Sequence, residues 1–209
     1  MVLEDISKKY NTDKSFDNFV GHNYSPFYDM ILKDKKENIK NVLEIGVAGG
    51  NSLRMWKEYF ENGKIYGWDI LDRKYLNDDK IETFIIDQGK QQQIDNFFVD
   101  NNIQIDFVID DGSHLLNDQI ISLFNIFPHL NNNGIYIIED MWYDCFDCFL
   151  KLGYKKDYIK NIDVRITNLI SEEKIKFLLE NIICCQKNNV IFSSSEDKSD
   201  HQFYVFYKK

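Results

Sequence analysis

The sequence has 209 residues, of which 15% are aromatic, and its formal net charge at pH 7 is −9. A chain of this length forms one domain with a sizeable core. The acidic balance argues against nucleic acid and membrane as partners, because both need a basic face. No apolar run is long enough for a transmembrane helix. The charged first ten residues lack the apolar segment of a signal peptide, so we expect a cytoplasmic protein.

The first 38 residues predict a helical extension. Pro26 suits the start of a helix, and apolar residues recur at helical spacing to about residue 36. Polar residues lie among the aromatic ones, so the segment either covers an edge of the sheet or closes over a ligand as a lid. The candidates for the second role are Asp13, Lys14, His22 and Tyr24.

From residue 41 onward, short apolar runs alternate with helical patterns. We expect helices over residues 51–62, 91–101 and 116–130, and strands over residues 41–45, 64–69, 81–87, 105–110 and 135–140. Near-continuous apolar strands separated by helices are typical of a parallel sheet that is covered on both faces.

The last third of the sequence is less regular. A helical pattern over residues 172–181 precedes two final strands, 190–192 and 203–207, which we expect to form an antiparallel hairpin. The predicted fold class is therefore α/β. It is a Rossmann-like, doubly wound, mostly parallel seven-stranded sheet with a C-terminal antiparallel hairpin and an N-terminal helical lid.

The first strand leads into a glycine-rich turn, Gly46–Gly50, directly before a helix, which is an arrangement that binds nucleotides. Asp69, at the end of the second strand, suits the ribose hydroxyls. Glu44 would repel a pyrophosphate but suits the ammonium group of S-adenosylmethionine, and the three-glycine pattern of dinucleotide-binding proteins is missing. We therefore favour S-adenosylmethionine over NAD. The other candidate cofactor-binding residues are Gly46, Asn51, Ser52, Asp87, Gln88 and Asp110.

A second group of acidic residues follows the fourth and fifth strands: Asp111, Glu139 and Asp140. Their hard oxygen atoms suit magnesium or manganese rather than zinc. His114, three residues after Asp111, could remove a proton near neutral pH. Alternatively, Asp111 merely caps the next helix and His114 packs on the surface. Because several acids surround it, we favour a catalytic role for His114 and Asp111.

Three segments carry a resemblance to a known family: Val42–Gly50, Ile109–His114 and Ile137–Asp140. Together they resemble the class I S-adenosylmethionine-dependent O-methyltransferases. Within that class, they are most similar to the metal-dependent sugar O-methyltransferases of the macrocin and mycinamicin type. The resemblance covers residues 10–145. It implies a class I methyltransferase domain over residues 39–209, with residues 1–38 as the N-terminal lid.

The resemblance also implies a reaction. A methyl group would pass from S-adenosylmethionine to a hydroxyl of a sugar or glycoside, with Asp111, Glu139 and Asp140 holding magnesium (or manganese) and His114 as general base. Trp142 begins an aromatic segment that could stack on a sugar or on an aromatic ring. A catechol-like diol therefore stays open as the acceptor, and so does a non-catalytic cofactor-binding subunit.

The partners follow from the same resemblance. We expect a small-molecule sugar or glycoside substrate, with no nucleic acid and no membrane, and self-association into a homo-oligomer stays open. The macrolide enzymes carry an additional N-terminal domain that these 209 residues do not contain. The identity of the substrate therefore does not carry over.

Overall fold

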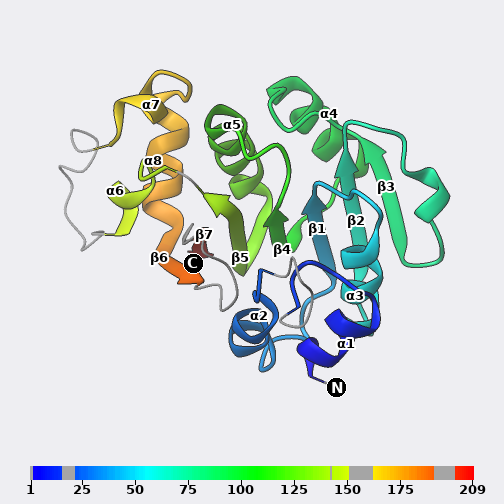
Figure 1. Ribbon diagram of the computed structural model, residues 1–209. Helices are drawn as coiled ribbons and strands as arrows, with labels where there is room; N and C mark the ends of the chain where they lie inside the picture. The colour runs from blue at the N-terminus through cyan, green and yellow to red at the C-terminus, as the bar shows by residue number, and fades with distance from the viewer. Residues whose placement is uncertain (1, 16–21, 142, 151–161, 191–200) are drawn as a thin grey trace.

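The computed structural model describes residues 2–15, 22–141, 143–150, 162–190 and 201–209. A single seven-stranded sheet forms its centre, in the order β3-β2-β1-β4-β5-β7-β6 (Figure 1). The strands are β1 (Asn41–Ile45), β2 (Lys64–Asp69), β3 (Ile81–Ile85), β4 (Ile105–Asp110), β5 (Leu130–Met141), β6 (Ile182–Val190) and β7 (His201–Lys208). The first five are parallel, and β7 pairs antiparallel with both β5 and β6. This confirms the predicted fold class.

Helices cover both faces of the sheet (Figure 1). One face carries α1 (Leu3–Lys9), α2 (Ser25–Leu32) and α3 (Asn51–Tyr59), and the other carries α4 (Gln91–Asn101), α5 (Leu116–Ile126) and α8 (Glu172–Asn181). Two short helices, α6 (Asp147–Leu150) and α7 (Val164–Thr167), precede α8. No helix in the described part of the chain has the length and apolar character that a membrane crossing requires.

The central strands explain why the core has two halves. In β4, Phe107 and Ile109 pack with α1, α2 and α3, whereas Val108 between them packs with α4 and α5. Successive side chains of a strand point to opposite faces, so a strand buried on both sides must be apolar throughout. The N-terminal extension belongs to the first half, because Leu3, Ile6, Tyr28 and Leu32 are buried in that cluster.

Several predicted boundaries were wrong. The penultimate strand is Ile182–Val190 and follows α8 directly, whereas the sequence predicted residues 190–192, of which 191 and 192 lie outside the described residues. The helix predicted to residue 130 ends at Ile126 and continues as a 3-10 turn, Phe127–His129, because Pro128 has no N–H group for another helical hydrogen bond. The fifth strand was predicted from residue 135 but begins at Leu130, and its pairing with β4 is irregular between Leu130 and Ile135.

The parallel strands all point the same way, so their carboxyl ends meet at one edge of the sheet. Glycine turns and acidic residues follow β1, β2 and β4 at this edge. In open α/β sheets this is where ligands bind.

Candidate active site

A cavity of about 600 Å³ opens at the carboxyl edge of the sheet. The turn after β1 forms one wall of it. Gly46 has φ +90°, and a Cβ atom there would lie 2.0 Å from the carbonyl oxygen of Asp111, so only glycine allows the two turns to approach. The predicted site residues that line the cavity are Asp13, Gly46, Asp69, Asp87, Gln88, Asp111 and His114.

Asp69 lies in the cavity wall at the end of β2. Its Oδ2 atom accepts hydrogen bonds from the backbone N–H of Ala48 at 3.1 Å and from Nε of Arg73 at 3.0 Å. Its Oδ1 atom accepts from the backbone N–H of Leu71 at 2.9 Å. These contacts fix the carboxylate against the glycine turn. Arg73, which also lines the cavity, was not a sequence candidate, because a loop arginine carries no signal of its own.

Glu44 is fully buried in β1. Its Oε2 atom accepts a hydrogen bond from the Ser52 hydroxyl at 2.9 Å, while Oε1 is buried with no hydrogen-bonding partner among the described residues. Burial raises the pKa of Glu44 to about 7, against the ammonium of Lys14, which favours the ionised form. A buried acceptor atom without a partner fits a cationic ligand such as an ammonium group.

Asp110 and Gln88 form a network beneath the cavity floor. The Gln88 amide donates to Oδ1 of Asp110 at 2.9 Å and accepts from the backbone N–H of Ser113 at the same distance. Oδ2 of Asp110 accepts from the hydroxyls of Tyr136, at 3.0 Å, and Ser122. Burial raises the pKa of Asp110 to about 6. Asp110 therefore holds the turn after β4 in place and does not line the cavity.

Asn51, another sequence candidate for cofactor binding, opens α3 with an exposed side chain. Arg54 donates to its Oδ1 atom at 3.1 Å, and its own amide donates to the backbone oxygen of Asn11 at 3.4 Å. Asn51 thus connects the start of α3 to the N-terminal segment and does not line the cavity.

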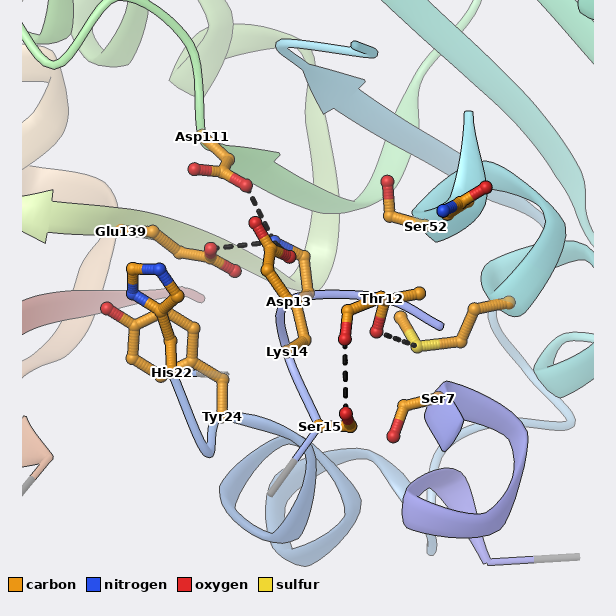
Figure 2. A network of polar contacts seen from close by, with 12 residues as sticks. Ser7, Thr12, Asp13, Lys14, Ser15, His22, Tyr24, Ser52, Asp111 and Glu139 are labelled. Carbon is orange, nitrogen blue, oxygen red and sulfur yellow. Dashed lines mark hydrogen bonds and ion pairs between the residues drawn. The ribbon is translucent and has the colours of Figure 1, made fainter. Parts of the chain in front are cut away.

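A buried lysine joins the acidic residues after β4 to those of β5. The ammonium of Lys14 lies 2.7 Å from Oδ2 of Asp111 and 2.7 Å from Oε2 of Glu139, as Figure 2 shows. The Tyr28 hydroxyl donates to the other oxygen of Glu139. Burial alone would lower the pKa of Lys14, but the two carboxylates outweigh it and hold this pKa well above its usual value. The sequence predicted Lys14 as a substrate or lid residue, and the structure places its buried ammonium between these two carboxylates.

His114 and Asp140 complete the acidic end of the site. The Nε2 atom of His114 lies 3.9 Å from Oδ1 of Asp111, and its Nδ1 atom is buried without a hydrogen-bonding partner in the described part of the chain. Oδ1 of Asp140 accepts from the Tyr24 hydroxyl at 2.6 Å and lies 3.4 Å from Nδ1 of His22. Burial would lower the pKa of His22, but Asp140 outweighs it and raises this pKa.

These side chains fit a divalent cation. Asp111, His114 and Asp140 can each offer one ligand atom, and the three atoms lie within 4.8 Å of one another. Magnesium needs ligand atoms about 2.0–2.1 Å away from it, so a small adjustment suffices. Glu139 is adjacent, but Lys14 and Tyr28 hold its two oxygens. Trp142, predicted to contact the substrate, lies outside the described residues.

Comparison with known proteins identifies related sequences, although no family model matches the chain. It is similar to the mycinamicin VI 2''-O-methyltransferase of Micromonospora griseorubida, with 39% identity over 147 residues, which are 67% of this chain and 36% of the relative. It is also similar to the demethylmacrocin O-methyltransferase of Streptomyces fradiae, with 37% identity over 58% of this chain and 32% of the relative. The chain thus spans about a third of the length of these relatives.

A solved structure agrees with the sequence relatives. The MycE methyltransferase of the mycinamycin biosynthetic pathway, in complex with Mg, SAH and mycinamycin VI, aligns with a TM-score of 0.69 and 28% sequence identity. The alignment covers 100% of this chain and 54% of that one. The described helices and strands of this chain therefore all lie in the aligned region, and that region is about half of a longer protein.

Proposed function

We propose that this chain, as a member of the family of sugar O-methyltransferases of the mycinamicin and macrocin type, transfers a methyl group from S-adenosylmethionine to a hydroxyl of a sugar or glycoside. One observation carries the proposal. A single cavity reaches from the glycine turn and Asp69 to Asp111 and His114. A methyl donor bound along the first part would present its reactive end to the second. Residues 39–209 would form the methyltransferase domain, with residues 1–38 as its lid.

The first group of site residues would bind the cofactor. Asp69 would accept hydrogen bonds from the ribose hydroxyls, and Asp87 lines the same part of the cavity beyond β3. The partnerless oxygen of Glu44 would bind the ammonium group of the methionine moiety. Ser52 orients Glu44, and Asp110 and Gln88 support the turn after β4. These last three residues act on the cofactor through their neighbours.

The second group carries the chemistry. Asp111, Asp140 and Glu139 are the proposed ligands for magnesium or manganese, and the bound cation would lower the pKa of the acceptor hydroxyl. His114, whose Nε2 atom faces the carboxylate of Asp111 at the cavity wall, is the proposed general base. In this role His114 stays off the cation, and Glu139 is the third ligand in its place. His114 would take the hydroxyl proton while the oxygen attacks the methyl group in line. Holding donor and acceptor together supplies much of the rate enhancement.

A thermal-shift titration tests the cofactor class. S-adenosylmethionine or S-adenosylhomocysteine at about 100 times its dissociation constant should stabilise the chain by about 2.7 kcal/mol. For a chain of this length the melting temperature should then rise by roughly 5–10 °C. NAD is the control ligand, and Asp69→Ala is the control variant, which should lose most of the rise. A rise with NAD alone would contradict the proposal.

Acceptors should then be compared in a methyl-transfer assay with magnesium. Glycosides with neighbouring hydroxyls should accept the methyl group, and catechols are the comparison, because they also present two oxygens to a cation. Methylation of catechols alone would contradict the sugar assignment while leaving the reaction class intact.

A further inference from the structure

Lys14 is the most buried of the described lysines, with 1% of its surface exposed. It comes from the N-terminal segment, and Figure 2 shows its side chain reaching past Asp13 toward Asp111 and Glu139. Its ammonium lies 2.7 Å from an oxygen of each. The carboxylate of Asp13 is 3.9 Å away and mostly exposed. Lys14 therefore interacts with two carboxylates that the proposed function assigns to a metal centre.

Lys14 brings a positive charge directly against two carboxylates of this centre. Asp111, Glu139 and Asp140 bring three negative charges into a space with little exposure, and unpaired buried charges are costly. A divalent cation supplies two positive charges, and the ammonium of Lys14 supplies the third. Without Lys14, Asp111 and Glu139 would lose the ammonium that lies 2.7 Å from an oxygen of each.

The geometry allows the lysine and a cation to be present together. Lys14 contacts Oδ2 of Asp111, whereas Oδ1 of the same carboxylate faces His114. The potential ligand atoms of Asp111, His114 and Asp140 lie within 4.8 Å of one another. Lys14 therefore holds one oxygen of Asp111 and leaves the other to the cation. Both oxygens of Glu139 accept a hydrogen bond, from Lys14 and from Tyr28, and each keeps a second lone pair that can face a cation.

We propose that Lys14 is a permanent counter-cation of the metal centre, a positioning residue that neutralises and orients Asp111 and Glu139 and does not contact the substrate. This inference rests on the proposed metal-dependent function. In the metal-free protein, Lys14 is the cation that makes the buried acidic cluster tolerable. Without the charge of Lys14, only a bound divalent cation would neutralise Asp111 and Glu139. The metal-free variant should therefore be less stable than wild type, and it should bind metal more tightly.

The test is Lys14→Met, which keeps an unbranched side chain but removes the charge. Thermal unfolding of the full chain would be measured with a chelator and with Mg²⁺, and the dissociation constant of Mn²⁺ by calorimetry. We expect a lower melting temperature in chelator, a larger rise on adding Mg²⁺ than in wild type, and a dissociation constant for Mn²⁺ lower by about tenfold or more.

Two controls separate charge from packing. Lys14→Arg keeps the charge and should respond to metal nearly as wild type does. Lys9→Met removes another lysine of the N-terminal segment, one whose ammonium lies 2.5 Å from Glu58 at an exposed position. It should leave the metal response unchanged, because this pair is remote from the acidic cluster.

A third variant keeps the test decisive if Lys14→Met does not fold in chelator. The double variant Lys14→Met/Glu139→Gln removes the lysine together with the more buried of its two carboxylate partners, which is less harmful than leaving both carboxylates without the lysine. It should therefore recover metal-free stability relative to Lys14→Met. Failure of the second substitution to restore any stability would contradict the inference.

The outcomes distinguish the inference from the function on which it rests. If wild type responds to Mg²⁺ but Lys14→Met binds Mn²⁺ as wild type does, or more weakly, the counter-cation role is wrong and the metal centre stands. If wild type neither gains stability from Mg²⁺ nor binds Mn²⁺, the metal centre itself is overturned, and the role of Lys14 with it.

Discussion

Glu44 combines full burial with an oxygen atom that has no partner. Because burial raises its pKa to about 7, against the favourable charge of Lys14, the carboxylate loses its charge as the pH falls through neutrality. An ammonium ligand binds the charged form only. We therefore predict that S-adenosylhomocysteine binds about tenfold more weakly at pH 6 than at pH 8.

Calorimetric titrations at pH 6, 7 and 8 would measure this dependence. Glu44→Gln is the control, since its amide does not titrate. This variant should bind weakly at every pH and lose the trend. A dissociation constant that is equal at pH 6 and pH 8 in wild type would remove Glu44 from the ammonium site.

His114 offers a second prediction for a single residue. His114→Ala should lower the turnover number by about 10²-fold or more and leave cofactor affinity nearly intact, because a general base acts on the proton and not on the cofactor. Steady-state kinetics with calorimetry would measure both quantities. His129→Ala is a control, as its ring stacks on Phe98, with ring centroids 3.9 Å apart, outside the cavity lining. Unchanged turnover in His114→Ala would exclude it as the base.

Single residues also show where sequence reasoning stops. Gly46, Asp69 and Asp111 each lie at or directly after the end of a strand. Local sequence patterns mark these strand ends, so the positions of the three residues could be predicted. The partners of Lys14 lie 97 and 125 residues further along the chain. A local sequence pattern gives no information about contacts over such a distance. The sequence alone therefore could not show that Lys14 forms a buried ion pair.

At the level of elements, the network of Asp110 connects β4 to α5 and β5. Tyr136 of β5 donates to this buried carboxylate at 3.0 Å. Tyr136→Phe should lower the free energy of unfolding by about 1.5–3 kcal/mol, since a hydrogen bond to a charged group is lost in the interior. Urea unfolding followed by circular dichroism would measure the change.

The matched control lies on β7. The hydroxyl of Tyr207 bonds to Gln186 at 3.3 Å in an exposed position, so Tyr207→Phe should change the free energy of unfolding by less than about 0.5 kcal/mol. Equal losses in the two variants would show that the network around Asp110 contributes no more than a surface contact.

The regular elements were predictable to different degrees. Strands β1, β2 and β4 matched their predicted ranges, because apolar runs and polar turns mark both of their ends. The start of β6 has no such mark. Glu172–Asn181 passes into Ile182 with no glycine or proline between them, so the apolar pattern gives no sign of where helix becomes strand.

For the whole molecule, the N-terminal segment combines two tasks. Its helices α1 and α2 bury apolar side chains on the same face as α3, and the residues between them contact the acidic centre. This segment is therefore part of the core as well as a cover for the site. The composition predicted an extension, but its packing depends on contacts with several strands that are distant in sequence.

The proposed metal dependence is tested on the complete molecule. Excess chelator should lower methyl-transfer activity by at least about a hundredfold, because the acceptor hydroxyl would keep its high pKa. Mg²⁺ added beyond the chelator should restore the activity, which excludes damage to the protein. Full activity in chelator would contradict the metal centre.

The long separation between Lys14 and its partners has a consequence for synthesis. Glu139 is translated 125 residues after Lys14. At about 5–20 residues per second, the ribosome needs roughly 6–25 s for that distance. During this interval the N-terminal segment has no carboxylate of β5 to bind. The proposed active centre is therefore completed only after the fifth strand has been synthesised.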